Sequence, residues 1–129
     1  MGFHVIRPED DVWEERPSRQ GVIRRVAEVT SAGALTQSRA RVWRYPPGAR
    51  GRRHLERAQE EVFVVLSGTL TMLLGDPPER FDLGPQSVVT VGTGTPLQMR
   101  NESDGEVVVF AYGAPPVTGQ AEYLDDVEL

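Results

Sequence analysis

Short runs in which apolar and polar residues alternate follow one another along the chain, separated by turns rich in glycine and proline. Successive side chains of a strand point to opposite faces, so a period of two indicates β-structure. The pattern predicts strands at 21–30, 36–45, 61–67, 69–74, 80–83, 87–91, 95–101 and 106–112. No helical pattern is longer than a turn or two. Short strands at this spacing predict an all-β fold, a sandwich or a barrel, in a single domain.

Three segments differ in character along the chain. Residues 1–35 are expected to form an N-terminal arm and edge strands, 36–116 the barrel, and 117–129 an acidic C-terminal tail. The first twenty residues form either an irregular arm or a short edge strand, and Trp13 anchors it to the body or to a second subunit. The tail is either loose or a closing flap.

Composition and charge exclude several classes of function. The chain has 129 residues, no cysteine and a net charge of −5. Without cysteine there are no disulfides, thiolate metal sites or cysteine nucleophiles. Nonspecific nucleic-acid binding requires an excess of cations, and crossing a bilayer requires about 20 consecutive apolar residues. The N-terminus also lacks the apolar run of a signal peptide. We therefore expect a cytoplasmic protein that binds neither nucleic acid nor membrane.

The most informative stretch is a polar loop that runs directly into an apolar strand and ends in a glycine turn. Gly48 is followed after five residues by His54, then by Glu56, by Glu61 after four more, and by Gly68 after another six. This spacing resembles the first motif of the cupin family, which has Gly, five residues, His-x-His, three or four residues, Glu, six residues and Gly. The sequence departs from the family pattern at Glu56, which stands where the family has its second His.

A second stretch, residues 83–101, is similar to the second cupin motif. Gly84 begins it, Gly92 and Gly94 flank the turn, and Asn101 ends it. Gly92 replaces the proline of the family turn, and Leu97 replaces the histidine that serves as a metal ligand in members with the full motif.

The resemblance, which covers roughly residues 40–112, implies a jelly-roll β-barrel with an internal pocket, commonly in a homodimer. In members with the full motif, three His and one Glu bind a divalent metal. Of that set, only His54 and Glu61 are present in this chain.

The residues themselves allow a reduced metal site. His54 and Glu56 share one parity in an extended chain, and with Glu61, five residues further on, they are expected to face the lumen. One imidazole and two carboxylates suit iron, manganese, nickel or zinc. The alternative is a metal-free pocket in which Arg39 and Arg41 offset the carboxylates, because a buried charge requires compensation. In a further alternative, Glu56 lies in a solvent-exposed loop and has no role.

The same alternation predicts the residues that line the pocket. Inward-facing positions on the expected strands give an apolar and aromatic pocket with a charged end, a common composition for small-molecule sites. Core packing is the alternative role for its apolar members, and Asn101 is expected to cap a turn. The candidate ligand-binding residues are Arg41, Trp43, Phe63, Val65, Leu97 and Met99.

Three functions are compatible with these residues. The first is a module that binds a small organic molecule in the apolar pocket without a full metal centre. The second is a metal-dependent dioxygenase or isomerase with His54, Glu56 and Glu61 as ligands. The third is a metal-free isomerase or cyclase in which Glu61 or His54 acts as acid or base.

Overall fold

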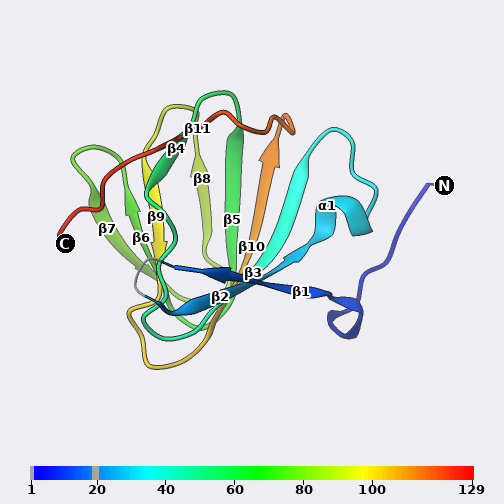
Figure 1. Cartoon of the computed structure of the whole chain (residues 1–129), viewed down its shortest axis with the longest axis horizontal. Coiled ribbons are helices and arrows are strands. Elements are labelled where there is room, and N and C mark those ends of the chain that lie inside the picture. The colour runs from blue at the N-terminus through cyan, green and yellow to red at the C-terminus, as the bar shows by residue number, and fades with distance from the viewer. Residues whose placement is uncertain (1, 19–20) are drawn as a thin grey trace.

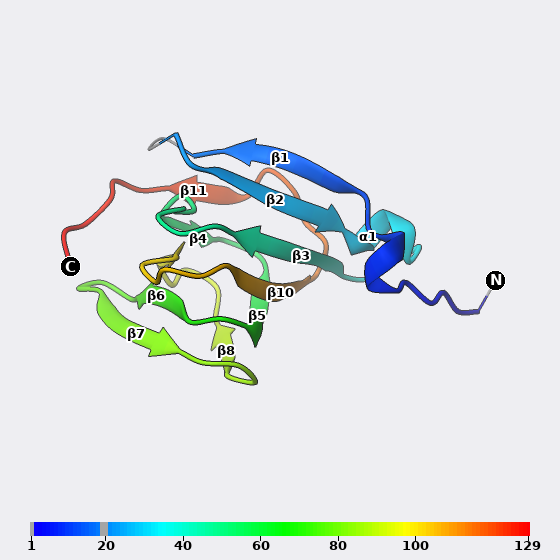
Figure 2. The same cartoon turned by 90° about the horizontal axis from the view of Figure 1, so that it is seen from below.

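The described residues, 2–18 and 21–129, form two antiparallel β-sheets in a computed structural model of the protein (Figures 1 and 2). One sheet has six strands in the order β1 (Trp13–Pro17), β2 (Ile23–Glu28), β3 (Arg39–Tyr45), β10 (Val107–Ala114), β5 (Glu60–Ser67) and β8 (Val88–Val91). The other has five in the order β11 (Ala121–Tyr123), β4 (His54–Glu56), β9 (Leu97–Arg100), β6 (Leu70–Leu74) and β7 (Glu79–Leu83). The all-β prediction is confirmed.

Helical structure in the described chain is limited to a 3₁₀ turn at Pro8–Asp10 and a single turn, α1 (Val29–Ala32). The predicted strand 21–30 is therefore too long, because its last two residues belong to α1. Thr30 explains the change: its hydroxyl accepts a hydrogen bond from the Ala40 amide at 2.9 Å and donates one to the Ala40 carbonyl at 3.2 Å. No helix in residues 2–18 and 21–129 has the length and apolar character of a membrane span.

Two short strands were not predicted. β4 lies in the polar stretch that was expected to be a loop, and β11 lies in the acidic tail. Each has three residues, and they pair with one another, Ala121 opposite Glu56 and Tyr123 opposite His54. A three-residue strand carries too little alternation to be recognised, and its stability comes from the neighbouring strands.

The C-terminal tail is attached to the body by several hydrogen bonds. Gln98, which is fully buried, donates through Nε2 to Asp126 Oδ1 at 3.1 Å. Arg100, also buried, donates to the Val127 carbonyl at 2.7 Å. Arg53 donates to the Asp125 carbonyl at 3.2 Å. The tail is therefore ordered against the five-stranded sheet, and its strand β11 forms one wall of the interior.

The apolar core fills one part of the space between the sheets, and charged side chains fill another. Along the inward face of β5 the side chains change from Glu61 through Phe63 to Val65, which is 1 % exposed. The core contains Val26, Trp43, Tyr45, Ala49, Phe63, Val65, Leu70, Met72, Val91, Leu97, Met99, Val107 and Val109. The candidate site is formed where the inward-facing side chains of the strands become polar, as at Glu61 of β5.

The turn between β5 and β6 requires glycine. Gly68 has φ of 79°, and a Cβ there would lie 2.4 Å from the carbonyl oxygen of Glu106. Gly68→Ala is expected to lower the free energy of unfolding by about 1–3 kcal/mol from the backbone conformation alone. Gly92→Ala is a matched control, because nothing lies within 4 Å of its Cβ position. Urea unfolding measures both; equal midpoints would show that this turn is not constrained.

Candidate functional site

A cavity of about 500 Å³ opens between the two sheets at their polar end. Of the predicted ligand-binding residues, Arg41, Trp43 and Phe63 line it, whereas the other three, Val65, Leu97 and Met99, lie in the apolar core. The lining is more polar than the sequence predicted. It comprises Arg24, Arg39, Ala40, Arg41, Trp43, Tyr45, Gly51, Arg52, His54, Glu56, Gln59, Glu61, Phe63, Ala111, Tyr112, Gly113, Thr118, Gly119, Ala121 and Tyr123.

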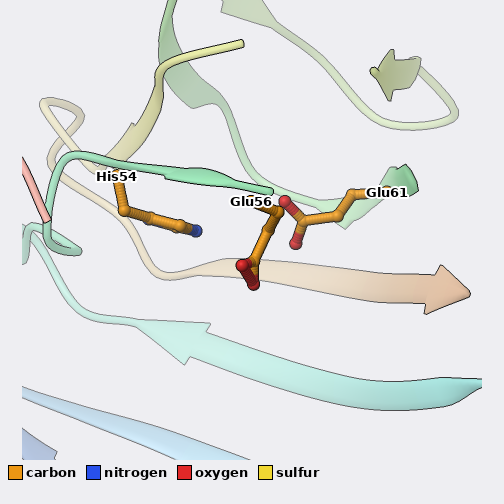
Figure 3. Close-up of side chains that lie close together, drawn as sticks. All are labelled: His54, Glu56 and Glu61. Carbon is orange, nitrogen blue, oxygen red and sulfur yellow. The ribbon is translucent and has the colours of Figure 1, made fainter. Parts of the chain in front are cut away.

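Three potential metal ligands meet in this cavity. His54 and Glu56 are two residues apart on β4 and therefore point to the same face, while Glu61 reaches them from the beginning of β5. One nitrogen of the imidazole and one oxygen of each carboxylate lie within 4.8 Å of one another (Figure 3). Glu56 thus belongs to a strand that lines the cavity, and the exposed-loop alternative is wrong.

The His54 ring is oriented by the backbone of the preceding loop. Its Nδ1 lies 2.9 Å from the carbonyl oxygen of Arg52. A carbonyl can only accept, so Nδ1 carries the hydrogen and the lone pair of the neutral ring is on Nε2. A backbone carbonyl that binds one ring nitrogen in this way is a common support for a metal-ligating histidine. Figure 3 shows the ring pointing toward the carboxylates.

Leu97 lies directly opposite His54 across the β4–β9 pair. It is 1 % exposed and packs in the core, so this position contributes an apolar side chain where the full family motif has a ligand. Asn101 is not part of the cavity lining. As expected it caps a turn: its amide donates to the Gly105 carbonyl, and its oxygen accepts from the Ser103 amide.

Glu61 is the most perturbed acid at the site. Burial raises the pKa of its carboxyl group to about 7, and the charge of Glu56 contributes to the same shift. Its Oε1 is buried and has no hydrogen-bond partner among the described residues. A buried carboxylate in this state is either protonated or in need of a cation.

Arg39 and Arg41 compensate Glu61 in part, without forming an ion pair with it. Both arginines act on Glu61 only at longer range, where they partly offset the rise in its pKa. Arg41 instead donates through Nε to Glu28 at 2.9 Å. The alternation had placed Arg41 on the correct face, but it could not show that Glu28 lies directly across the β2–β3 pair.

Gln59 explains why Arg39 and Glu61 remain apart. Both residues pair with Gly113 of β10, from opposite sides, so the three lie in one row across the sheet. A Cβ on Gly113 would lie 2.5 Å from Cδ of Gln59, which means that the Gln59 side chain covers the glycine. Its Nε2 donates to the Pro115 carbonyl at 3.0 Å, which holds it between the two charges.

Several lining residues were not among the predicted site residues. Arg24 comes from β2, Arg52 from the loop before β4, and Tyr123 from β11. Arg52 and His54 are adjacent to Tyr123: the Arg52 guanidinium carbon is 3.7 Å from the Tyr123 ring centroid, and the His54 ring is 6.1 Å away. The clustering of arginines in residues 39–57 was a signal for Arg52, but nothing in the sequence indicates Tyr123.

The comparison with protein families agrees with this architecture. The profile of the cupin domain matches residues 41–112, which is more than half of the chain. The chain therefore belongs to the cupin family, and its facing sheets are those of the family's jelly roll. No curated protein matches the sequence.

Solved structures with the same fold are similar over most of the chain. A sugar phosphate isomerase of the cupin superfamily from Silicibacter pomeroyi has a TM-score of 0.79 at 21% identity, covering 95% of this chain and 83% of its own. A predicted oxalate decarboxylase from Thermotoga maritima has a TM-score of 0.76 at 15% identity, with 87% and 99% covered. A putative sugar phosphate isomerase from Acidithiobacillus ferrooxidans also has 0.76 at 15% identity, with 97% and 95% covered. These similarities establish the fold.

Glu61→Gln is expected to be more stable than the wild type above pH 7 in the presence of a chelator. The pKa of about 7 in the folded state exceeds the ordinary value of 4.5, so only the folded state holds this proton between those values. Stability from this group is therefore complete below about pH 4.5 and is lost as pH rises to 7. The advantage of Glu61→Gln should be roughly 1–3 kcal/mol at about pH 8.

Glu60→Gln is the matched control for this measurement, because Glu60 is the exposed neighbour on β5. Thermal or urea unfolding of the two variants and the wild type, at about pH 5 and pH 8, gives the comparison. A Glu61→Gln advantage that does not grow with pH would contradict the raised pKa.

Proposed function

We propose that this cupin is a small-molecule enzyme that uses a divalent cation held by His54, Glu56 and Glu61. The observation that carries the proposal is the convergence of one imidazole and two carboxylates on one cavity, within 4.8 Å of each other. The sequence had favoured a binding module in an apolar pocket. The polar lining and the uncompensated carboxylate support a cation-dependent site instead.

The donor set fits a divalent first-row ion. Neutral imidazole and carboxylate oxygens together suit manganese, iron, nickel and zinc. The unpartnered Oε1 of Glu61 is a buried acceptor that a cation would satisfy. Bonds of about 2.0–2.2 Å would draw the three ligand atoms slightly closer together. When bound, such an ion supplies a Lewis acid that polarises a carbonyl or hydroxyl oxygen.

The protein groups have separate tasks in this proposal. His54 offers Nε2 because its Nδ1 is held by the Arg52 carbonyl. Glu56 and Glu61 supply negative charge from two different strands, and Leu97 supplies no fourth ligand. With three protein ligands, coordination positions remain for water or substrate, as reactive metal sites require. The cavity of about 500 Å³ has room for a small organic molecule beside the ligands.

Isomerisation is the reaction class that we favour. Two of the similar structures are named as sugar phosphate isomerases, although their sequence identities of 21% and 15% support only the fold. A cation held by the three ligands would polarise a carbonyl or hydroxyl oxygen of the substrate, which is the assistance that an aldose–ketose isomerisation needs.

A metal-free isomerase or cyclase is the second candidate. The specific observation in its favour is the buried position of Glu61 beside Glu56, which gives Glu61 a pKa suited to a general acid or base near neutral pH. In this case Glu61 or His54 moves the proton, and no cation is required.

His54→Ala is expected to abolish binding of Mn²⁺ or Zn²⁺, measured by calorimetry on protein without a histidine tag. Loss of an outer-sphere partner already lowers metal affinity by about 10–100-fold, and loss of a ligand should cost at least as much. The other histidine of the chain, exposed His4, provides the matched control His4→Ala, which should bind one ion as the wild type does. Equal binding by both variants would rule out this ligand set.

Turnover separates the two candidates. We would incubate the protein with aldoses, ketoses and their phosphates in D₂O and follow isomerisation and deuterium uptake by NMR. Activity that is lost with chelator and in Glu56→Gln supports the cation-dependent enzyme. Activity that survives chelator and is lost in Glu61→Gln supports the second candidate. If small molecules raise the melting temperature but the protein shows neither metal binding nor turnover, the result supports a binding module and contradicts both enzyme candidates.

We also propose a homodimer. Support comes from the N-terminal arm, where Phe3, Val5 and Val12 are 85%, 65% and 78% exposed and where β1 forms an open edge of the six-stranded sheet. Figure 1 shows this arm extending away from the body. Deletion of residues 1–11, which leaves β1 intact, is expected to halve the mass measured by light scattering. An unchanged mass would exclude the arm from the interface.

A further inference from the structure

Arginines without a carboxylate partner gather in the cavity. Most arginines in the described part of the chain form an ion pair with Asp or Glu. The exceptions there are Arg7, Arg24, Arg39 and Arg52, and the last three all line the cavity. Arg24 and Arg39 are half-buried, and Arg52 is exposed. Because the chain has a net charge of −5, carboxylates are in excess, and cations that remain unpaired around one cavity indicate an anion from outside.

Arg24 is fixed in place by two aromatic rings. Its guanidinium carbon is 5.0 Å from the Trp43 ring centroid and 5.7 Å from that of Tyr45, and Nη1 donates to the Tyr45 hydroxyl at 3.3 Å. Its Nε is buried and has no acceptor among residues 2–18 and 21–129. Nη2 donates to the Pro17 carbonyl at 3.5 Å. Stacking uses the face of a guanidinium, so the remaining N–H groups at its edge stay available. A ligand oxygen would satisfy this buried donor.

Arg52 connects the arginines to the proposed metal ligands. Its side chain stacks on Tyr123, and its backbone carbonyl accepts the hydrogen bond from Nδ1 of His54. The same residue therefore orients the imidazole through its backbone and places a cation on the neighbouring Tyr123 ring. An anionic group held at Arg52 would keep the rest of a small molecule next to His54 and Glu56.

Arg39 contributes a third cation from β3. The Gln59 side chain covers Gly113, the residue between Arg39 and Glu61, and no direct ion pair forms between the arginine and the acid. Within the described chain, the Arg39 side chain makes neither a hydrogen bond nor an ion pair, and its donors remain available to a ligand.

We propose that Arg24, Arg39 and Arg52 form an anion subsite for a terminal carboxylate or phosphate of the molecule that reacts at the His54 cluster. The planar guanidinium matches the oxygens of both groups in a bidentate geometry. The proposal deepens the proposed function, since it names the chemical class of the substrate: a small organic anion. The arginines attract that anion into the cavity, where the imidazole and carboxylates can meet it.

Three three-carbon probes test the subsite: glycerol, glycerate and glycerol 3-phosphate, titrated calorimetrically into metal-free protein. At least one of the two anions should bind, with an affinity that falls as salt is added, and neutral glycerol should not. Arg39→Gln and Arg52→Gln should each weaken binding roughly 10-fold or more. Arg25→Gln is the control, because Arg25 follows Arg24 on β2 but is exposed and pairs with Glu15.

The identity of the bound anion distinguishes a phosphate-bearing substrate from a carboxylate-bearing one. Equal binding of all three probes, binding of none, or anion binding that is unchanged in Arg39→Gln and Arg52→Gln would overturn the subsite. The wild-type comparison of anion with neutral probe needs no variant, so it decides the matter even if a substitution impairs folding.

The experiment also separates the subsite from the proposed metal function. Metal binding without discrimination between anionic and neutral probes would overturn the subsite and leave the metal site. Arginine-dependent anion binding by a protein with no affinity for Mn²⁺ or Zn²⁺ would retain the subsite and overturn the cation-dependent enzyme.

Discussion

Charges of both signs line one cavity without a direct ion pair between Glu61 and Arg39, and the proposed function rests on this separation. Glu61 and Arg39 lie in the same row of the six-stranded sheet, with Gly113 between them and Gln59 covering the gap. A direct ion pair would satisfy both groups and leave little for a ligand. The structure instead contains a carboxyl group whose pKa is raised to about 7 and guanidinium groups held on aromatic faces. Unsatisfied groups of this kind are characteristic of binding and catalytic sites.

The rest of the fold has to compensate for this unfavourable arrangement. The apolar part of the interior is densely filled, with Leu70, Met72, Val107 and Val109 each fully buried. Burial of one such side chain contributes about 1.5–3 kcal/mol. The C-terminal segment contributes in another way, because its hydrogen bonds to Arg100 and to other buried side chains hold β11 in place. The stability gained from the apolar core and the C-terminal segment offsets the cost of burying charged groups in the cavity.

A period of two was sufficient to predict most of the strands, but not the three-residue β4 and β11. Alternation placed His54 and Glu56 on one face, and the spacing of the glycines placed Glu61 near them. Alternation also placed Arg41 on the inward face. It could not predict the ion pair of Arg41 with Glu28, because that pair depends on the register of two strands. Tyr123 and Arg24 come from segments far from the motif, and only the sheet order brings them to the cavity. The same limit explains why Val65, Leu97 and Met99 lie in the core: parity gives the face of a strand but not the depth at which the cavity ends.

The proposed metal ligands and the unpaired arginines of the cavity are complementary in charge. A divalent cation bound by two carboxylates and a neutral imidazole is a neutral unit, whereas three histidines and one glutamate would leave such a site with a charge of about +1. Glu56 in place of a histidine therefore removes the attraction that the metal itself would exert on an anionic substrate. In the proposed site the arginines would supply that attraction, with Arg52 joined to His54 through a backbone hydrogen bond. The proposal thereby assigns binding of the anion and polarisation of the reacting oxygen to different groups, so that a substitution can remove one without the other.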